Sequence, residues 1–272
     1  MSVNRALLVV QLCAIAACGG EPSVAAPRPA AASTSPGRAM RYRVEVGPRA
    51  AGSWHADAGS DSAECHAGQR ILVDQVSNAR DLGGVSLSPT QSVVCGALYR
   101  GPPLAALSRT GCDEFARLGV RTVIDLRIPE EAAADPDSDC VAQKAHQVFA
   151  PLPIPYNVSP QNYIAVLDTT ASVAAAFAAF GDAAAYPIYF HCTLGRDRTG
   201  VLSAVVLLAL GATPADILSE YLLSRASVGA YPLSLQAALD EIERRGGIEA
   251  YLAAVGVSED QLATLRAQAV LH

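Results

Sequence analysis

Short apolar runs alternate with longer segments of helical spacing from residue 71 onward, and this alternation predicts strands connected by helices. Three runs have the length and the β-branched or aromatic content of buried strands: residues 93–99, 120–126 and 187–190. Two segments between them begin with helix-capping residues: Thr110 to Gly119, and a helix opened by Ser159-Pro160 that extends to about Phe180. We therefore predict an α/β fold with a central, mainly parallel sheet flanked by helices.

Helices dominate the C-terminal part of the chain. Residues 199–210 are almost entirely apolar, which predicts a buried central helix, and the segment is shorter than the roughly 20 residues that a membrane span needs. Further helices are expected at residues 213–225, 233–245 and 248–255, and in a last segment capped by Ser258 and Gln261. By contrast, residues 127–139 hold five acids and two prolines and are predicted to form an exposed loop in which Asp135, Asp137 and Asp139 are solvated.

The N-terminus has the pattern of a targeting segment. Arg5 precedes an apolar run that is too short for a stable span, and the run ends in Ile15-Ala16-Ala17-Cys18. An aliphatic residue and two small residues before a cysteine resemble a bacterial lipobox, so we expect residues 1–17 to be a signal peptide and Cys18 to carry lipid. The protein would then be exported and lipid-anchored to a bacterial membrane, on its periplasmic or cell-surface side. The alternative is a plain secretory signal with an incidental cysteine.

Composition divides the rest of the chain. Residues 18–40 consist mostly of Ala, Pro, Ser and Gly and are expected to be a flexible, lipidated tether. Residues 41–68 form an N-terminal extension of mixed character, and the folded domain is expected over residues 69–272. The formal net charge of −6 and the lack of a basic stripe exclude a nucleic-acid partner. The five histidines are scattered without ligand spacing, so neither a metal nor another cofactor is expected.

One stretch couples a strand to a helix through a short loop. The strand at residues 187–190 is followed by His191-Cys192, and Arg198-Thr199 opens the apolar helix six positions after the cysteine. A phosphate monoester is a dianion, and the loop N–H groups together with the helix N-terminus supply positive potential without bulky side chains. Gly195 permits a backbone conformation that a Cβ would oppose, and the Arg198 guanidinium suits two phosphoryl oxygens. The same field would favour the thiolate of Cys192, which is the nucleophilic form.

The stretch Tyr189 to Gly200 resembles the signature loop His-Cys-x5-Arg-Thr/Ser of the cysteine-dependent phosphatases. More narrowly, it resembles the bacterial tyrosine and lipid phosphatases whose loop reads His-Cys-x-x-Gly-Lys-Asp-Arg-Thr-Gly, with Arg196 in place of the lysine. Other segments match the same phosphatases over most of residues 71–272: Asn78 to Gly84, Leu98-Tyr99-Arg100, Gly119 to Arg127 followed by Glu130, Gly247 to Leu252, and Leu262 to Arg266. Gly101 stands where these relatives carry serine.

The resemblance implies a cysteine-phosphatase-like fold and a phosphomonoester hydrolase that acts through a cysteinyl-phosphate (phosphocysteine) intermediate without a cofactor. The simplest interpretation is a protein-tyrosine phosphatase acting on phosphotyrosine. The alternative is a phosphoinositide or inositol-phosphate phosphatase, because Arg196 and Arg198 would suit a polyanionic head group. A sulfurtransferase also uses a cysteine in a similar loop, but Asp197 and Thr199 beside Arg198 count against it. The presence of Cys192, Arg198 and Asp125 together counts against a non-catalytic phosphate-binding module.

The resemblance also assigns roles to single residues. Cys192 is the expected nucleophile and Arg198 its catalytic partner, and His191 and Thr199 support them. His191 is expected to hold the loop through a ring-to-backbone hydrogen bond, and the Thr199 hydroxyl to bond to the sulfur. Phosphate binding is expected along the whole loop: Thr193, Leu194, Gly195, Arg196, Asp197 and Arg198. Arg80 and Asp81 are expected to form a structural ion pair, and the alternative is that they contact the substrate.

The leaving oxygen needs a proton, so a carboxylic acid must stand opposite the cysteine. Asp125 ends the strand at 120–126, and open α/β sheets place their sites at that edge. The resemblance favours Asp125 as the acid, and Asp197 inside the loop is the other candidate. Asp125 could instead be a strand-end carboxylate paired with Arg127 or Arg80.

Export would leave the mature protein in a compartment where disulfides persist. Cys13 would leave with the signal peptide, and Cys18 and Cys192 have the roles given above. Four cysteines remain: Cys65, Cys95, Cys112 and Cys140. We predict at least one disulfide among them, and the alternative is that all four are small buried apolar residues.

Overall fold

The computed structural model describes residues 67–272 apart from 72, 75, 106, 155–157 and 272. The predicted signal peptide, the tether with Cys18, and all but the last two residues of the extension lie outside the described residues, as does Cys65. The predicted folded domain falls almost entirely within them.

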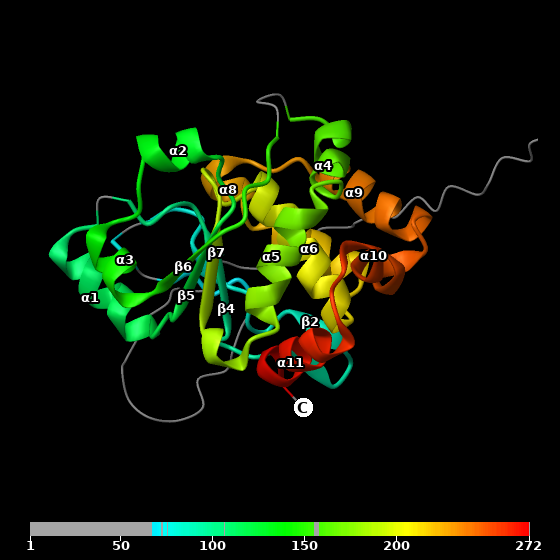
Figure 1. Cartoon of the computed structure of the whole chain (residues 1–272), viewed down its shortest axis with the longest axis horizontal. Helices are drawn as coiled ribbons and strands as arrows, with labels where there is room; N and C mark the ends of the chain where they lie inside the picture. Colours follow the sequence, from blue (N-terminus) through cyan, green and yellow to red (C-terminus); the bar gives the residue numbers. More distant parts are fainter. Residues whose placement is uncertain (1–66, 72, 75, 106, 155–157, 272) are drawn as a thin grey trace, which may run out of the picture. The chain divides into compact units, whose positions relative to one another are not determined.

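A five-stranded sheet forms the centre of the described part, in the order β1-β4-β7-β5-β6. The strands are Arg80–Asp81 (β1), Leu98–Gly101 (β4), Ile188–His191 (β7), Thr122–Asp125 (β5) and His146–Phe149 (β6). Strands β4, β7, β5 and β6 run parallel, whereas β1 is antiparallel to β4. The predicted α/β fold with a mainly parallel sheet is therefore confirmed (Figure 1).

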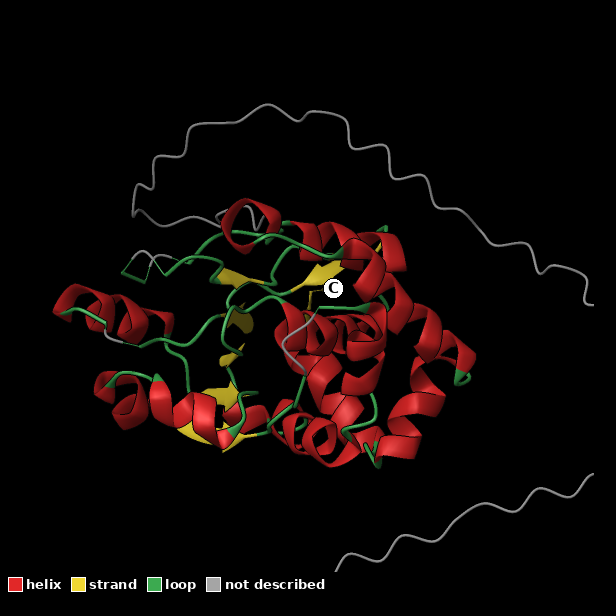
Figure 2. Ribbon diagram, turned by 90° about the horizontal axis from the view of Figure 1, so that it is seen from above, coloured by secondary structure: helices red, strands yellow, loops and turns green. Residues whose placement is uncertain are grey.

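Helices pack on both sides of this sheet (Figure 2). Their bounds are Arg109–Leu118 (α1), Pro129–Ala134 (α2), Asp139–Lys144 (α3), Pro160–Val166 (α4), Thr170–Phe180 (α5), Asp197–Leu210 (α6), Pro214–Leu222 (α7), Arg225–Val228 (α8), Pro232–Arg244 (α9), Gly247–Val255 (α10) and Glu259–Ala269 (α11). A short 3₁₀ helix, Ala183–Ala185, precedes β7. The predicted helical C-terminal part is confirmed.

Successive residues of each central strand contribute to different apolar clusters. Ile124 and Phe190 pack in the larger core with α5 and α6, while Val123 and Tyr189 pack in a second cluster with α1 and α3. Because both faces are covered, the strands read as continuous apolar runs rather than as alternating ones. In α6, 12 of the 14 residues are buried, which confirms the predicted central helix.

Three predicted segments differ from the structure. The run at 93–99 is not one strand, because Gly96 turns the chain with φ +76° and its N–H donates to the Asp81 carboxylate at 2.6 Å. The helix predicted over 159–180 is two helices, α4 and α5. The exposed loop predicted at 127–139 contains α2 and the start of α3. Among the described residues, no single helix is both long and apolar enough to cross a membrane, and α4 and α5 meet those criteria only as a pair bent by 60°.

A second, antiparallel sheet was not predicted. It pairs Ser86–Ser88 (β2) with Gln91–Val93 (β3), and β3 with Val270–Leu271 (β8) at the C-terminal end of the chain. The pairing of β3 with β8 joins residues far apart in sequence and leaves no local signal, and β8 has only two residues.

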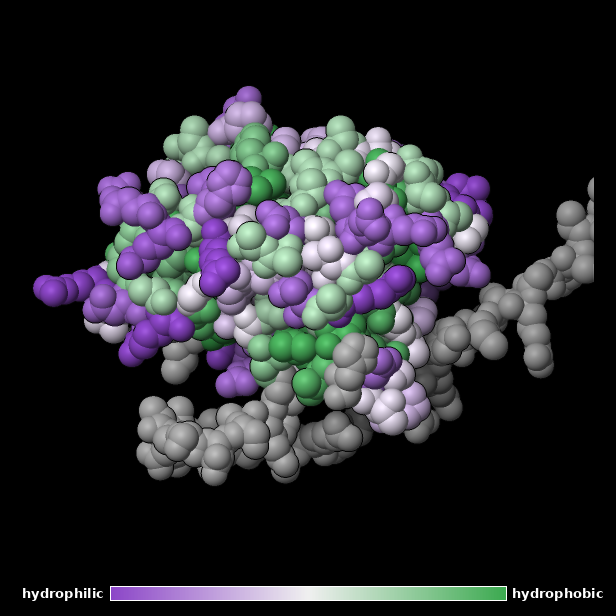
Figure 3. Space-filling model, turned by 60° about the horizontal axis from the view of Figure 1, so that its bottom comes forward, coloured by the Kyte–Doolittle hydropathy of each residue, from purple (hydrophilic) through white to green (hydrophobic). Residues whose placement is uncertain are grey.

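Six large apolar side chains remain exposed among the described residues: Phe149, Leu194, Leu223, Tyr231, Leu233 and Leu271. On the face shown in Figure 3, polar and apolar residues are otherwise interspersed, with one larger apolar area along the lower margin. Leu194 lies in the loop that follows β7, and Tyr231 contacts a side chain of that loop.

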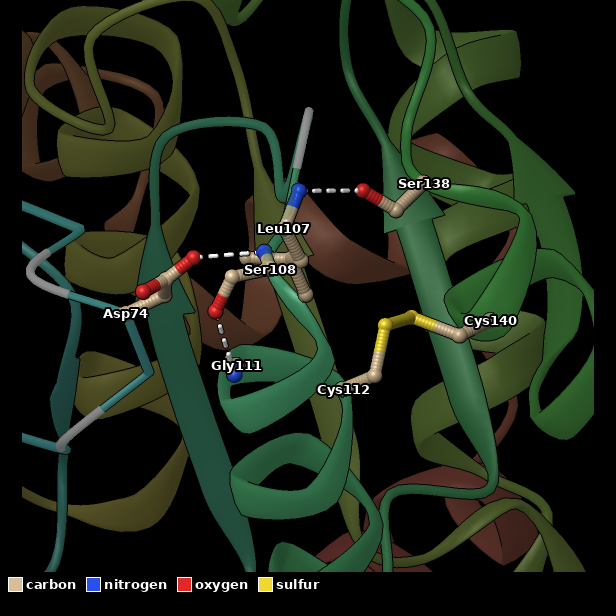
Figure 4. Close-up of a disulfide and its surroundings, with 7 residues drawn as sticks. All are labelled: Asp74, Leu107, Ser108, Gly111, Cys112, Ser138 and Cys140. Atoms are coloured by element: carbon tan, nitrogen blue, oxygen red, sulfur yellow. Dashed lines mark hydrogen bonds between the residues drawn. A yellow bond between two sulfur atoms is a disulfide. The ribbon is translucent and has the colours of Figure 1, made fainter.

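A disulfide joins the first turn of α1 to the first turn of α3, between Cys112 and Cys140 (Figure 4). Side-chain hydrogen bonds tie the same helix starts to neighbouring segments: the Leu107 N–H donates to the Ser138 hydroxyl at 2.7 Å, and the Ser108 N–H donates to Asp74 at 2.6 Å. The prediction of at least one disulfide among the four candidate cysteines is thus confirmed. Cys95 is also disulfide-bonded, and Cys192 is the free cysteine of the described part.

Replacing Cys112 and Cys140 together by serine is expected to lower the free energy of unfolding. The bond closes a sequence separation of 28 residues, for which loss of the constraint on the unfolded chain corresponds to about 3–4 kcal/mol. Urea unfolding of the oxidised protein and of the double variant measures the difference. Equal midpoints and slopes would show that the bond does not stabilise the fold.

Candidate active site

The loop of residues 192–198 begins where β7 ends and leads directly into α6. His191 is paired with Gly101 of β4 on one side and with Asp125 of β5 on the other, so the carboxyl ends of three strands meet beside Cys192. Cys192 is 1% exposed, and Arg198 and Thr199 are buried in the first turn of α6. The structure therefore brings the expected nucleophile and the expected arginine to the edge of the sheet where open α/β folds bind ligands.

Gly195 has the conformation predicted for it. Its φ is +64°, and a Cβ at this position would lie 2.3 Å from the carbonyl carbon of Gly101 and 2.5 Å from its oxygen. A side chain is therefore excluded twice, by the left-handed backbone and by the backbone of β4. The glycine lets the loop lie directly against the neighbouring strand.

Two polar side chains hold the carbonyl groups of this loop. The Asn78 Nδ2 donates to the Leu194 carbonyl at 2.9 Å, and the Arg100 Nη2 donates to the Gly195 carbonyl at 2.7 Å. Both residues belong to segments that match the phosphatase pattern, but their contacts with the loop could not be predicted from that match. The predicted ion pair between Arg80 and Asp81 is not formed. Arg80 pairs with Glu220 instead. Asp81 instead accepts from the N–H groups of Gly83 and Gly96.

Arg198 is oriented by Glu131 from the first turn of α2. Its Nη1 and Nη2 donate to the two Glu131 oxygens, with an Nη2–Oε1 distance of 2.8 Å, and Nη2 also donates to the Thr193 hydroxyl at 3.0 Å. The hydrogen bond from Arg198 lowers the pKa of Glu131 to about 2. Burial alone would lower the pKa of Arg198, but Glu131 and Cys192 raise it above its ordinary value. Sequence reasoning missed Glu131 because it lies in the segment predicted to be a solvated loop.

The Arg196 side chain contacts its neighbour Asp197, the last residue of α8 and the residue that precedes α9. Its Nε donates to Asp197 at 2.9 Å, its Nη1 donates to the Val228 carbonyl, and its guanidinium carbon lies 4.6 Å from the centroid of the Tyr231 ring. This is a cation–π geometry. The side chain of Arg196 is therefore engaged with the protein on three sides.

The two candidate acids have different surroundings. The Asp125 oxygens accept from the Arg127 backbone N–H at 2.9 Å, from its Nε at 2.9 and 3.1 Å, and from its Nη2 at 2.8 Å. The structure thus contains the ion pair between Asp125 and Arg127 that was predicted from the sequence as the alternative to a catalytic role for Asp125. Asp197 accepts from the Tyr163 hydroxyl and from Arg196, both at Oδ1, and its side chain is 18% exposed against 11% for Asp125.

Two supporting residues differ from expectation. The ring of His191 makes no hydrogen bond to backbone within the described part; its Nε2 lies 3.1 Å from Asp137 and its Nδ1 lies 3.9 Å from Asp125. The Thr199 hydroxyl has no hydrogen-bond partner among the described residues, so the expected bond to the sulfur is not formed. The polar environment of His191 is carboxylate rather than carbonyl because Asp137 folds inward.

Asp137 was predicted to be solvated, and that prediction is wrong. Its side chain is 9% exposed and accepts the Leu104 N–H at 2.6 Å. Burial alone would raise its pKa, but His191, Leu104 and Arg127 hold it below its ordinary value. Asp125, Asp137 and His191 bring donor atoms within 4.8 Å of one another, as a metal site would. The Arg127 guanidinium pairs with both carboxylates, so their charge is already balanced by a protein cation.

Comparison with known proteins gives a consistent assignment. A family model described as the tyrosine phosphatase family matches residues 71–270. The chain is 34% identical over 170 residues to the "Putative tyrosine-protein phosphatase" of Cupriavidus necator, covering 56% of this chain and 62% of that relative. The chain thus spans less than two thirds of the length of that relative.

Two solved structures are similar at lower identity. The core catalytic domain of the PP-IP phosphatase SIW14 from S. cerevisiae, in complex with citrate, is 20% identical with a TM-score of 0.36, over 57% of this chain and 90% of the other. A second structure of the Siw14 catalytic core gives the same identity and TM-score, over 57% and 89% of the two chains.

Proposed function

Because the chain belongs to the tyrosine phosphatase family, we propose that it hydrolyses phosphate monoesters through a cysteinyl-phosphate formed on Cys192. The observation that carries this proposal is the loop itself. A free cysteine, 1% exposed, lies at the carboxyl edge of the parallel sheet, and the first turn of a buried helix follows within six residues. The N–H groups of that turn have no partners within the helix and attract anions.

The reaction needs two displacements at phosphorus. The Cys192 thiolate attacks, a sulfur–phosphorus bond forms, and the bond to the leaving oxygen breaks as that oxygen takes a proton. Water then attacks phosphorus and gives a proton to the carboxylate that protonated the leaving oxygen, the sulfur–phosphorus bond breaks, and inorganic phosphate leaves with the thiolate restored. The Arg198 guanidinium stands beside the nucleophile to balance the charge on the phosphoryl oxygens, and Glu131 fixes its plane.

For the proton, we propose Asp197 rather than Asp125. Both hydrogen bonds that Asp197 accepts within the described part are made at Oδ1, which leaves Oδ2 to carry the proton. Asp125 uses both oxygens in its contacts with Arg127. A general acid must also face the substrate, and Asp197 is the more exposed of the two side chains.

Phosphotyrosine is the substrate class that the surroundings of the loop support best. Leu194 is 41% exposed in the loop, and Tyr231 is 43% exposed beside Arg196, which provides apolar surface for an aromatic leaving group. The alternative, a phosphoinositide, relied on two cations in the loop. Both are already paired with carboxylates of the protein, Arg196 with Asp197 and Arg198 with Glu131.

The test compares phosphate release from a phosphotyrosine peptide with release from a phosphoinositide, in the presence of EDTA. The expected result is faster release from the peptide, together with an acid-quenched intermediate that mass spectrometry locates as phosphate on Cys192. Preferential release from the phosphoinositide would replace the substrate class and keep the mechanism. Turnover without a phosphorylated cysteine would overturn the mechanism.

We further propose that the protein is exported and lipid-anchored through Cys18. The support is the sequence Ile15-Ala16-Ala17-Cys18 and the polar tether that follows it. Cell fractionation of the wild type and of Cys18→Ala is the test, and membrane association that survives the substitution would count against lipidation.

A further inference from the structure

One buried carboxylate holds two buried arginines behind the loop. Glu220 of α7 is 3% exposed, and its Oε1 lies 2.7 Å from the Nε of Arg80 while its Oε2 lies 2.6 Å from the Nη1 of Arg100. The two arginines are 2% and 0% exposed. Burial alone would raise the pKa of Glu220, but Arg100 and Arg80 hold it below its ordinary value. The three side chains therefore form an ionised group closed to solvent.

Each arginine leads from Glu220 to a different carbonyl of the loop. Arg100 reaches it directly, because its Nη2 donates to the Gly195 carbonyl at 2.7 Å. Arg80 reaches it through Asn78: its Nη1 donates to the Asn78 Oδ1 at 2.5 Å, and the Asn78 Nδ2 donates to the Leu194 carbonyl at 2.9 Å. Two series of contacts that start at the Glu220 carboxylate therefore end on the carbonyl groups of two consecutive residues, Leu194 and Gly195.

The consequence follows from the geometry of the peptide bond. In a trans peptide the C=O and the N–H of the next residue point in opposite directions. Holding the Leu194 and Gly195 carbonyls toward Asn78 and Arg100 therefore turns the N–H groups of Gly195 and Arg196 to the other side of the loop. Donors that are aligned before an anion arrives need no reorganisation when it binds.

Arg100 makes its contacts with Glu220 and Gly195 although one of its own donors stays unpaired. The Arg100 Nε is buried without a hydrogen-bond partner in the described residues, while both of its terminal nitrogens are engaged. A guanidinium satisfies this geometry because its fork presents two donors at a fixed angle, one for Glu220 and one for the Gly195 carbonyl. A single ammonium on a flexible stem would reach one of the two.

We propose that Asn78 and Arg100 are positioning residues that align the loop amides for a tetrahedral oxyanion, with Glu220 as their common anchor. The proposal rests on the function proposed above and names the residues outside the loop that determine its affinity. None of the three is placed to touch the substrate.

The test measures the binding of tungstate, a tetrahedral oxyanion, to the full chain by calorimetry, alongside turnover of para-nitrophenyl phosphate. Asn78→Asp keeps the oxygen that Arg80 needs and removes the donor to Leu194. Arg100→Lys keeps a cation beside Glu220 and removes the hydrogen bond to the Gly195 carbonyl. Each is expected to weaken tungstate binding about tenfold, the size of one buried hydrogen bond, and to lower kcat/KM by a similar factor.

Tyr186→Phe is the matched control, because it also removes a buried side-chain bond to a carbonyl, that of Phe180 at 2.7 Å, and lies away from the loop. It is expected to lower the melting temperature without changing tungstate affinity. Tungstate affinity in Asn78→Asp and Arg100→Lys equal to that of the control would overturn the proposal. A wild type that binds tungstate without turnover would overturn only the proposed function, and one that binds no tungstate would overturn both.

Discussion

Replacement of Cys192 by serine is expected to reduce the turnover of para-nitrophenyl phosphate by a factor on the order of 10⁴ or more, to the limit of the assay. The serine hydroxyl has nearly the volume of the thiol but is not ionised near neutral pH, so no nucleophile faces the phosphorus. The measurement is phosphate release by the full chain in EDTA, which removes contaminating metal-dependent phosphatases.

Binding separates a lost nucleophile from a lost fold. Because the loop amides and Arg198 are unchanged in Cys192→Ser, tungstate should still bind and the melting temperature should stay near that of the wild type. Undiminished turnover in this variant would exclude a cysteinyl-phosphate mechanism. A variant that neither turns over nor binds tungstate would point to a collapsed loop, which the change of one buried atom does not predict.

The features predicted from sequence were those that short segments determine. The apolar runs that form β5 and β7, and the apolar helix α6, can be recognised from a few consecutive residues. Segments that are apolar throughout are buried on all sides, so their position in the core could be predicted as well. The loop between β7 and α6 is also local, since its glycine and its helix start lie within six residues of Cys192. Gly195 could be assigned a special conformation before its φ of +64° was known.

The supporting contacts could not be predicted, because they join residues far apart in sequence. Glu220 lies 140 residues from Arg80 and 120 from Arg100, and on α7 it looks like any acid on an amphipathic helix. Asp137 and Glu131 were assigned to a solvated loop by composition. Both fold inward because two cations, Arg127 just after β5 and Arg198 in the first turn of α6, lie at the same edge of the sheet. Charge balance at a sheet edge is a tertiary property that local composition does not reveal.

Asp197→Asn is expected to lower kcat for a substrate with a poor leaving group by about 10²–10³, the usual contribution of a general acid. The amide cannot give up a proton, so the leaving oxygen departs as an anion. The loss should therefore grow as the leaving group becomes more basic, from para-nitrophenol to an alkyl alcohol. Rates over a series of aryl and alkyl phosphates measure this dependence for wild type and variant.

Asp125→Asn is the matched comparison, because it makes the same chemical change at the other candidate. Its carboxylate pairs with Arg127, whose Nη2 lies 2.8 Å away, so the amide leaves a buried guanidinium with weaker acceptors. We expect a loss of about 1–3 kcal/mol in the free energy of unfolding and a small, leaving-group-independent change in kcat. The reverse pattern, with steep leaving-group dependence in Asp125→Asn and none in Asp197→Asn, would assign the proton to Asp125. In that case Arg127 would have to release the carboxylate when substrate binds.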